Sequence, residues 1–471
     1  MYRSGYLKTF FCIHLVLLGF TSCKTTSTEK PVAKLYVTTL DKSKLLEEQL
    51  IFPQEKETEI DAVITIDTSN TYQEMDGFGY TLTGGSALHI HNMSKSPREQ
   101  LLQELFGTGK DEIGVSYLRL SIGGSDLDER PWSYNDLPDG ETDIALEKFS
   151  LAYDTLYLIP IIKEILKIAP DIKILGSPWS PPPWMKDNKD TRGGSLKEEY
   201  YDVYAQYFVK YINAMKENGI TIDAVTVQNE PLHPKNNPSM LMLAEQQAAF
   251  IKKHLGPAFE KNNIKTKIII YDHNADRPDY PISILNDTAT AKYIDGSAFH
   301  LYNGKIEALA QVHETHPNKN LYFTEQWIGE PGDFAGDMSW HTEHLIIGAS
   351  RNWCKAVLEW NLAADENQEP HTDRGGCVGC LGALTITGDT VVRNPAYYII
   401  AHASKFVRPG SVRVASEIDG NILNVAFKTP QGNIVVILQN KNGKDKSIRI
   451  KAGEKSMNMV LKPGSVGSLI F

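Results

Sequence analysis

The middle of this chain alternates short strand-like runs with helix-like segments, and that alternation limits its fold more than any other feature. The runs are rich in β-branched and aromatic residues. The segments between them, such as Leu156–Ile168, Glu198–Asn218 and Leu241–Leu255, have the apolar spacing of helices. Eight strands separated by helices favour an α/β fold, the (β/α)8 TIM barrel. An open doubly wound sheet is the alternative, but its glycine-rich dinucleotide motif is missing, because Gly77-Phe78-Gly79 has no third glycine. The strands are expected at Gly77–Thr81, Val115–Ile122, Ile172–Trp179, Ala224–Glu230, Lys267–Asn274, Gly296–Tyr302, Asn320–Trp327 and Ala356–Ala363.

A second, smaller domain is expected after about residue 405. There the helical segments stop, and short alternating runs are separated by turn sequences such as Asp419-Gly420 and Asn442-Gly443. This pattern predicts a β-sandwich, which the strand-like segments Lys34–Thr39 and Ala62–Asp67 are expected to join. The predicted division is a signal peptide over 1–23, a flexible tether over 24–33, N-terminal sandwich strands over 34–76, the barrel over 77–404 and the C-terminal β-sandwich over 405–471.

The N-terminus has the pattern of an export signal of the bacterial lipoprotein type. Arg3 and Lys8 precede the apolar run Phe10–Phe20, which is long enough for a signal peptide but too short to span a bilayer comfortably. Small residues then lead to Cys23, the expected site of lipidation. We therefore expect export to the cell envelope and a lipid anchor in the outer membrane of a Gram-negative bacterium, with secretion without a lipid as the alternative.

The composition excludes some classes of partner. With 41% hydrophobic and 23% charged residues, the 471-residue chain is typical of a globular protein. Its net charge of −10, without a long basic run, argues against a nucleic-acid substrate. Nothing implies a cofactor, and contact with a membrane is expected only through the lipid anchor. The oligomeric state stays open.

The cysteines and histidines do not indicate a metal site. Cys377 and Cys380 form a single CxxC with no partner motif at zinc spacing, so a local disulfide or free thiols are expected. His341 and His344 lie in HTEH, which lacks the spacing of the HExxH proteases, and a position on a helix surface is preferred.

Two glutamates, Glu230 and Glu325, each follow a strand-forming run, Ala224–Gln228 and Leu321–Thr324. In barrel enzymes the active site lies at the C-terminal ends of the strands. Glycoside hydrolysis needs two carboxyl groups there, one to protonate the leaving oxygen and one to attack or to activate water. The alternative is that both are loop residues at the surface, as most glutamates are.

Other predicted strand ends carry residues that suit a sugar. The apolar face of a sugar stacks on aromatic rings, and its hydroxyls need charged or amide partners. A single tryptophan is more often a core residue, but several at strand ends indicate a carbohydrate cleft. The residues are Asp126, Trp179, Asn229, Tyr302, Trp327, Trp360 and Asn361.

These residues lie in stretches that together resemble glycoside hydrolase family 30, which contains lysosomal glucosylceramidase and microbial endo-β-1,6-glucanases. The stretches follow one another through the barrel region, and the flanking sandwich segments fit the layout of the family. They are QEMDGFGYTLTGGSA (Gln73–Ala87), YLRLSIGGSDL (Tyr117–Leu127), ILGSPWSPPPWMK (Ile174–Lys186), VTVQNEP (Val225–Pro231), FHLY (Phe299–Tyr302), FTEQW (Phe323–Trp327) and EWNL (Glu359–Leu362).

The resemblance implies retaining hydrolysis, with Glu230 as acid/base and Glu325 as nucleophile. The charge of Glu325 is expected to help keep Glu230 protonated in the resting state. Asn229 is expected to hydrogen-bond the sugar 2-hydroxyl. Further sugar contacts are implied for Asp126, Trp179, Tyr302, Trp327 and Trp360, with Arg119 orienting the carboxylates from beneath.

Two segments depart from the family pattern. Thr83–Ser86 reads Thr-Gly-Gly-Ser where members often have Thr-Asp-Ala, and the loop His371–Cys380 replaces an asparagine-containing stretch of the lysosomal enzymes. Both are expected where the leaving group is recognised, which argues against ceramide. The sequence therefore favours an exported endo-β-1,6-glucanase. The alternatives are a glucosylceramidase or exo-β-glucosidase with the same catalytic pair, and a non-catalytic glycan-binding protein.

Overall fold

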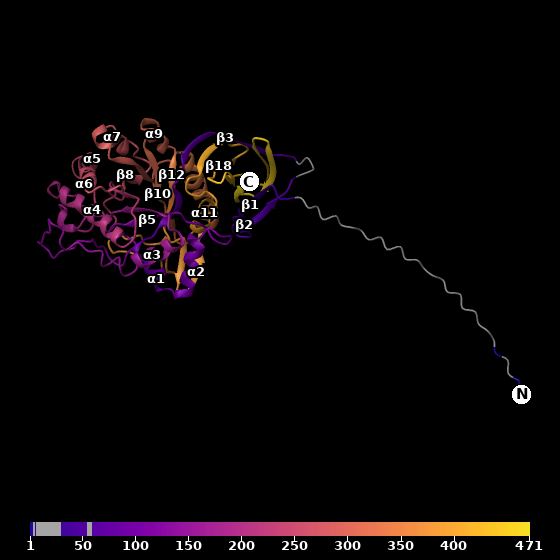
Figure 1. The fold of residues 1–471 in the computed structure, drawn as a ribbon, viewed down its shortest axis with the longest axis horizontal. Coiled ribbons are helices and arrows are strands. Elements are labelled where there is room, and N and C mark those ends of the chain that lie inside the picture. Colours follow the sequence, from indigo (N-terminus) through magenta and orange to yellow (C-terminus); the bar gives the residue numbers. More distant parts are fainter. Residues whose placement is uncertain (3–4, 6–29, 54–58) are drawn as a thin grey trace.

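A computed structural model describes residues 1–2, 5, 30–53 and 59–471, and places a barrel beside a second domain that is rich in strands (Figure 1). Cys23 and nearly all of the expected export signal lie outside the described residues, so export and lipidation stay predictions. Among the residues that are described, no helix combines the length and the apolar character needed to cross a membrane.

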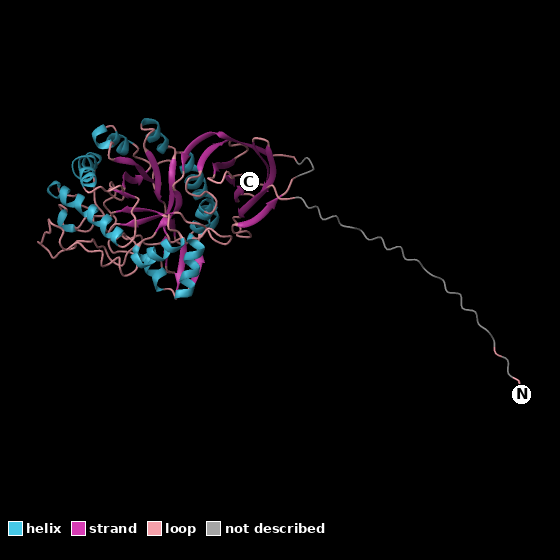
Figure 2. Ribbon diagram, viewed as in Figure 1, coloured by secondary structure: helices cyan, strands magenta, loops and turns pink. Residues whose placement is uncertain are grey.

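Eight parallel strands close into a barrel that is surrounded by helices, as the sequence predicted (Figure 2). The ring is complete because the last strand, β12, pairs with the first, β4, which rules out the open doubly wound sheet. Several strands end earlier than predicted, and the fourth stops at Thr226 rather than at Glu230. The barrel strands are β4 (Gly77–Thr81), β5 (Tyr117–Ser121), β6 (Lys173–Ser177), β7 (Ala224–Thr226), β8 (Lys267–Asn274), β9 (Ile294–His300), β10 (Asn320–Glu325) and β12 (Cys354–Asn361).

The helices agree closely with the predicted segments. The segment predicted over Leu241–Leu255 begins at Ala244 and continues through a π-helical turn, Ile251–Leu255, into the next helix. The α-helices are α1 (Gly84–Asn92), α2 (Lys95–Phe106), α3 (Leu158–Ile168), α4 (Tyr201–Glu217), α5 (Ala244–Phe250), α6 (Gly256–Lys261), α7 (Asp279–Leu285), α8 (Thr288–Ala291), α9 (Ala308–Thr315), α10 (Phe334–His341) and α11 (Pro395–Ser404), with 3-10 turns at Pro183–Met185 and Glu198–Tyr200 and a second π-helical turn at Thr342–Ala349.

The HTEH sequence does not lie wholly on a helix surface, so that prediction is wrong for His341. This residue ends α10 and is buried, with Nδ1 2.8 Å from Oε1 of Glu359 on β12. The segment that follows, Thr342–Ala349, contacts β12 on one side and strands of the second domain on another. A helix that is covered from two sides buries more of its circumference than its sequence pattern indicates.

Side chains fill the barrel in layers, because alternate residues of a strand face the interior. The lower layer is an apolar cluster made of Tyr117, Leu175, Ala224, Ile269, Ala298, Tyr322, Ala356 and Leu358. Two residues further along most of these strands the interior turns polar. This upper layer contains Arg119, Ser177, Thr226, His300 and Thr324. The floor of the barrel is therefore packed with apolar side chains, and the polar side chains lie in the layer just below the mouth.

The second domain is one nine-stranded sheet that folds around its own apolar core. The edge strands β2 and β21 contact each other, so the sheet curls into a sandwich. The N-terminal strands β1 and β3 join it, as predicted, whereas the charged edge strand β2 was not predicted. In spatial order the strands are β2 (Glu47–Ile51), β1 (Ala33–Thr38), β22 (Val466–Ile470), β19 (Ile434–Asn440), β18 (Ile422–Lys428), β17 (Val412–Ser416), β3 (Ala62–Glu74), β20 (Lys446–Ala452) and β21 (Lys455–Leu461).

Two small sheets carry the loops that leave the barrel near β10 and β12. The first pairs two short strands from distant parts of the chain, and the second is a three-stranded sheet. Their strands are β11 (Ile328–Gly329) with β14 (Cys380–Leu381), and β13 (Ala363–Ala364) with β15 (Leu384–Thr387) and β16 (Thr390–Arg393).

Helix α11 joins the two domains, and His402 is its polar contact with the sheet. The His402 Nε2 atom lies 2.8 Å from Thr38 Oγ1 on β1, and Nδ1 lies 2.8 Å from Ser468 Oγ on β22. Burial lowers the pKa of His402 to about 3. The ring is therefore neutral in the folded protein at neutral and mildly acidic pH, and the two hydroxyls satisfy both of its nitrogens.

We expect His402 to make the folded protein sensitive to acid. Below pH 6.5 the unfolded chain binds a proton on this residue that the folded protein does not, so the free energy of unfolding falls as the pH falls toward 3. At pH 5 this loss is about 2 kcal/mol. In urea unfolding of parent and His402→Asn proteins, the decrease in stability between pH 7 and pH 5 should be smaller in the variant. An equal decrease in both proteins would contradict this assignment.

Candidate active site

A buried carboxylate, Asp272, organises the polar layer of the barrel. Its Oδ2 accepts hydrogen bonds from Arg119 (2.9 Å), Ser177 (2.7 Å) and Thr226 (2.7 Å). Its Oδ1 accepts from Thr324 (2.6 Å) and lies 3.1 Å from His300 Nε2. Burial alone would raise the pKa of Asp272, but the charge of Arg119 and these hydrogen bonds hold it well below the usual range. One anion thus fixes side chains from β5, β6, β7, β9 and β10.

A bulge in β8 brings two successive residues, Asp272 and His273, into the site. In a regular strand their side chains would point to opposite faces. Here Tyr271 and Asp272 have positive φ angles, +72° and +64°, and the pairing with β9 shifts register between Tyr271 and His273. Such bulges redirect side chains and are frequent next to active sites. Sequence reasoning missed both residues, although their place in the polar end of this strand (YDHN) was a signal that could have identified them.

Glu325 ends β10 and is held by two donors. Arg119 donates to its Oε2 at 2.6 Å, and the hydroxyl of Tyr302 donates to its Oε1 at 2.9 Å. His300 Nδ1 lies 3.6 Å from the same Oε1. A register shift at the end of β10 accompanies this inward turn. A buried guanidinium and a phenol hydroxyl thus fix the two oxygens of Glu325 at the barrel mouth.

Glu230 lies in a turn past the end of β7 and has different neighbours. Its φ is +45°, and its backbone N–H donates to the Asp272 carbonyl at 2.9 Å, which fixes the turn against β8. Oε1 lies 3.4 Å from Nδ1 of both His273 and His300, and Oε2 accepts from Asn236 at 3.1 Å. Because His300 Nδ1 is 3.4 Å from Glu230 Oε1 and 3.6 Å from Glu325 Oε1, these two oxygens are at most the sum, 7.0 Å, apart.

The neighbouring histidines, rather than Glu325, set the direction in which the pKa of Glu230 shifts. Burial raises its pKa, but the contacts and charges of His273 and His300 outweigh this and lower it below the ordinary range. Burial lowers the pKa of His300, while Glu325, Asp272 and Glu230 together raise it to about 9. The prediction that the charge of Glu325 keeps Glu230 protonated is therefore wrong, because the two histidines lower the pKa of Glu230.

Both glutamates line a cleft of about 310 Å³ at the barrel mouth. Of the residues expected to contact sugar, Asp126, Tyr302, Trp327 and Trp360 line it too, so the structure brings the sequence-selected set together. His233, Asn236 and Asn274 also line the cleft and were not selected from the sequence, whereas Gly375–Cys377 belong to the loop His371–Cys380 that was expected at the leaving group.

The three other expected site residues are buried beside the cleft. Trp179 stacks on Trp360 with ring centroids 5.3 Å apart, and the Arg119 guanidinium lies 4.8 Å from the Trp179 ring. Asn229 Oδ1 accepts from Arg119 at 2.6 Å. The expectation that Arg119 orients both carboxylates holds for Glu325 only, since Glu230 is contacted by histidines and by Asn236 instead.

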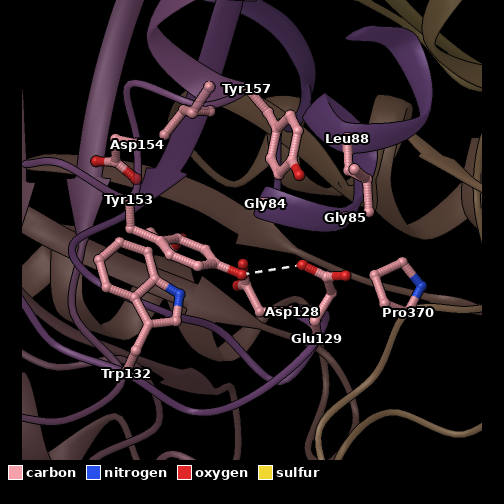
Figure 3. A pocket seen from close by; sticks show the side chains of 12 residues that line it. Gly84, Gly85, Leu88, Asp128, Glu129, Trp132, Tyr153, Asp154, Tyr157 and Pro370 are labelled. Carbon is pink, nitrogen blue, oxygen red and sulfur yellow. Dashed lines mark hydrogen bonds between the residues drawn. The ribbon is translucent and has the colours of Figure 1, made fainter. Parts of the chain in front are cut away.

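The Thr83–Ser86 segment does not lie where a leaving group would bind, so that expectation is wrong. Thr83 is the N-cap of α1, and its Oγ1 accepts from the Ser86 backbone N–H. Gly84 and Gly85 line a separate small cavity with Asp128, Trp132 and Asp154 (Figure 3). Its volume of about 10 Å³ has room for about one water molecule and none for a sugar. The small side chains of Thr83–Ser86 allow α1 to pack closely against its neighbours.

The loop His371–Cys380 does form a wall of the cleft, as expected. Cys377 and Cys380 form a disulfide, which was one of the two alternatives left open. Cys377 lines the cleft, and Cys380 packs with Trp179 and Trp360 in one apolar cluster. The disulfide therefore fixes this loop against the aromatic side of the site.

Comparison with known families agrees with the geometry. The description "Glycosyl hydrolase family 30 TIM-barrel domain" matches residues 75–407, and "Glycosyl hydrolase family 30 beta sandwich domain" matches residues 410–469. The chain belongs to glycosyl hydrolase family 30. It is a glycosidase built from the barrel and sandwich of that family, as the resemblance implied.

The similar proteins in the family include endo-1,6-glucanases and glucosylceramidases. The chain is 33% identical over 418 residues to endo-1,6-beta-D-glucanase neg1 of Aspergillus fumigatus, which covers 83% of each chain. It is 29% identical over 426 residues to the lysosomal acid glucosylceramidase of Mus musculus, covering 85% of this chain and 82% of the mouse protein. The solved structure of the endo-beta1,6-glucanase BT3312 is 36% identical with a TM-score of 0.87, covering 93% of this chain and 98% of that one.

We expect removal of the Asp272 charge to disrupt the site and the fold together. Asp272→Asn would leave the Arg119 guanidinium buried with one anion fewer, at a cost of about 3–5 kcal/mol in the free energy of unfolding. Activity should fall as well, because the Arg119 and His300 side chains lose their shared anchor. Urea unfolding and hydrolysis rates measure the two effects.

Asp279→Asn is a matched control. Asp279 also pairs with an arginine, Arg277, but its side chain is 64% exposed. The control should change stability by less than about 1 kcal/mol. Equal effects of the two substitutions would contradict a central role for Asp272.

Proposed function

We propose that this glycosidase is a retaining endo-β-1,6-glucanase. The observation that carries the mechanism is the pair Glu230 and Glu325, whose facing oxygens lie at most 7.0 Å apart and which are held by different side chains. Retaining enzymes need carboxyl groups about 5–5.5 Å apart, closer than the spacing of inverting enzymes, which leaves room for a water. Both glutamate oxygens lie close to the same nitrogen, His300 Nδ1, and this favours the shorter carboxyl spacing of retaining enzymes.

In the first step Glu325 attacks the anomeric carbon. The glycosidic C–O bond breaks, a glycosyl-enzyme ester forms on Glu325, and the leaving oxygen takes a proton from Glu230. Arg119 and Tyr302 hold the two Glu325 oxygens before attack, so the nucleophile is oriented. The proton that Glu230 delivers is available from His300, whose Nδ1 is 3.4 Å from Oε1.

In the second step water replaces the leaving group. Glu230, now without its proton, removes one from the incoming water, which attacks the anomeric carbon and releases Glu325. Two inversions at the same carbon give net retention of the β configuration.

Unpartnered polar atoms beside the cleft support binding of a sugar there. Asp126 Oδ1, Trp179 Nε1 and both side-chain polar atoms of Asn361 are buried and have no hydrogen-bond partner within the described part of the chain. A buried polar atom without a partner costs about 1–3 kcal/mol, and sugar hydroxyls would satisfy these atoms. Trp327 and Trp360 offer ring faces for stacking in the same cleft.

The substrate assignment rests on the relatives and on the cleft wall. The A. fumigatus protein and the BT3312 structure, both named endo-1,6-glucanases, are more similar to this chain than the mouse glucosylceramidase is. The disulfide-bonded loop at Cys377 also borders the cleft where the sequence departs from the lysosomal enzymes. Both observations favour a glucan over ceramide-linked glucose.

We expect the two glutamates to respond differently to the leaving group. Glu325→Gln should lose at least about a thousandfold in turnover on every substrate, because the nucleophile is lost. Glu230→Gln should lose about 10²–10⁴-fold on β-glucan but much less on an aryl β-glucoside, whose phenolate leaves without a proton. Steady-state kinetics on both substrates test this.

The matched control is Glu359→Gln, a buried glutamate of β12 that pairs with His341 on α10 rather than facing the cleft. It should stay within a few-fold of the parent rate. Retained turnover in Glu325→Gln would contradict the role of Glu325 as the nucleophile.

We expect the products to identify the substrate and the stereochemistry. Incubation with β-1,6-glucan should give a ladder of gluco-oligosaccharides, and NMR should detect the β anomer first. Activity confined to glucosylceramide, or release of glucose alone, would favour the glucosylceramidase or exo-glucosidase alternative, and initial α anomer would overturn retention.

A further inference from the structure

We propose that Glu230, His273 and His300 together form a binding site for a divalent transition-metal ion such as Zn²⁺, and that an ion bound there switches the enzyme off. Three potential ligand atoms, one from each residue, lie within 4.8 Å of one another, and all three residues are buried. They come from the turn after β7 and from the ends of β8 and β9.

The spacing fits a tetrahedral ion. Glu230 Oε1 lies 3.4 Å from His273 Nδ1 and 3.4 Å from His300 Nδ1. Ligand atoms about 2.0–2.2 Å from zinc at tetrahedral angles are separated by roughly 3.3–3.5 Å. Two of the three spacings thus match a tetrahedral ion, and the third, between the two histidine nitrogens, is within 4.8 Å, so the rings would draw together around the ion.

Both histidines have features of metal ligands. His300 Nε2 lies 3.1 Å from Asp272 Oδ1, so a carboxylate orients the ring and leaves Nδ1 directed at Glu230, the arrangement that supports histidines in zinc sites. His273 Nδ1 is buried and has no hydrogen-bond partner among the described residues, since its 3.4 Å contact with Glu230 is not aligned as a hydrogen bond. A buried nitrogen without a partner, 3.4 Å from a carboxylate oxygen, is available to an ion.

The donor set selects the class of ion and leaves a position open. Two imidazoles and one carboxylate are the ligands of many catalytic zinc sites, and they favour Zn²⁺ or Cu²⁺ over the oxygen-seeking Mg²⁺ and Ca²⁺. Glu325 is not among the three, because Arg119 and Tyr302 already hold its oxygens. Solvent from the cleft would complete the coordination.

The inhibitory part of this inference rests on the proposed function. An ion that takes the Glu230 Oε1 lone pair prevents this carboxyl group from carrying a proton to the leaving oxygen. The binding part does not depend on that role, so binding and inhibition are measured separately.

Binding is tested on untagged full-length protein freed of metal with a chelator. Isothermal titration calorimetry should give one Zn²⁺ per chain and no signal with Mg²⁺ at the same concentrations. His273→Gln and Glu230→Gln should each weaken Zn²⁺ binding by more than about tenfold. His233→Gln is the matched control, a histidine that lines the same cleft but lies outside the cluster, and it should bind Zn²⁺ like the parent.

Inhibition is tested with an aryl β-glucoside, each variant being compared with its own metal-free rate. Zn²⁺ should inhibit the parent and the His233→Gln variant reversibly, and the chelator should restore the rate, whereas His273→Gln should need more than about ten times as much Zn²⁺. Absence of Zn²⁺ binding, or equal binding by parent and His273→Gln, would overturn the site. Binding at the site without inhibition would leave the site standing and overturn the role proposed for Glu230.

Discussion

The ion pair between Asp272 and Arg119 is the interaction on which the rest of the site depends. Both side chains are fully buried, where an unpaired charge of either sign would be costly. Arg119 in turn bonds Glu325 and Asn229, and Asp272 orients His300, which contacts Glu230. The Glu325 side and the Glu230 side of the cleft are thus positioned by opposite ends of one buried pair, at the level where the barrel interior changes from apolar to polar.

This arrangement gives two chemically identical glutamates different properties. A guanidinium that is permanently charged holds Glu325, whereas Glu230 is held by imidazoles, which can give up or accept a proton. The same imidazoles explain why the site suits a proton-transfer role and also a transition-metal ion, since both use the nitrogen lone pair. A metal site was not expected from the sequence, because its members come from three separate elements, while the HTEH sequence that resembles a metal motif places His341 against Glu359.

The sequence analysis identified those features of the fold and the site that depend on local patterns of residues. The two glutamates Glu230 and Glu325, the aromatic residues Trp327 and Trp360, and the eightfold alternation could all be recognised in the sequence. It failed where a side chain's direction depends on backbone irregularity. Asp272 and His273 are neighbours that regular strand geometry would separate, and only the positive φ angles at Tyr271 and Asp272 turn both into the site. It also failed at Thr83–Ser86, where packing of α1, not ligand binding, explains the small residues.

Local patterns in the chain were enough to predict the barrel, the flanking sandwich, the family and the two carboxylates, because strand periodicity and short motifs are properties of neighbouring residues. Which other groups share the site follows only from the three-dimensional packing. This depends on distances between β5, β8, β9 and β10 across the closed barrel, and on burial that makes each contact strong. Whether a glutamate faces an arginine or two histidines is a fact of three-dimensional packing, and here it separates the two carboxylates into different roles.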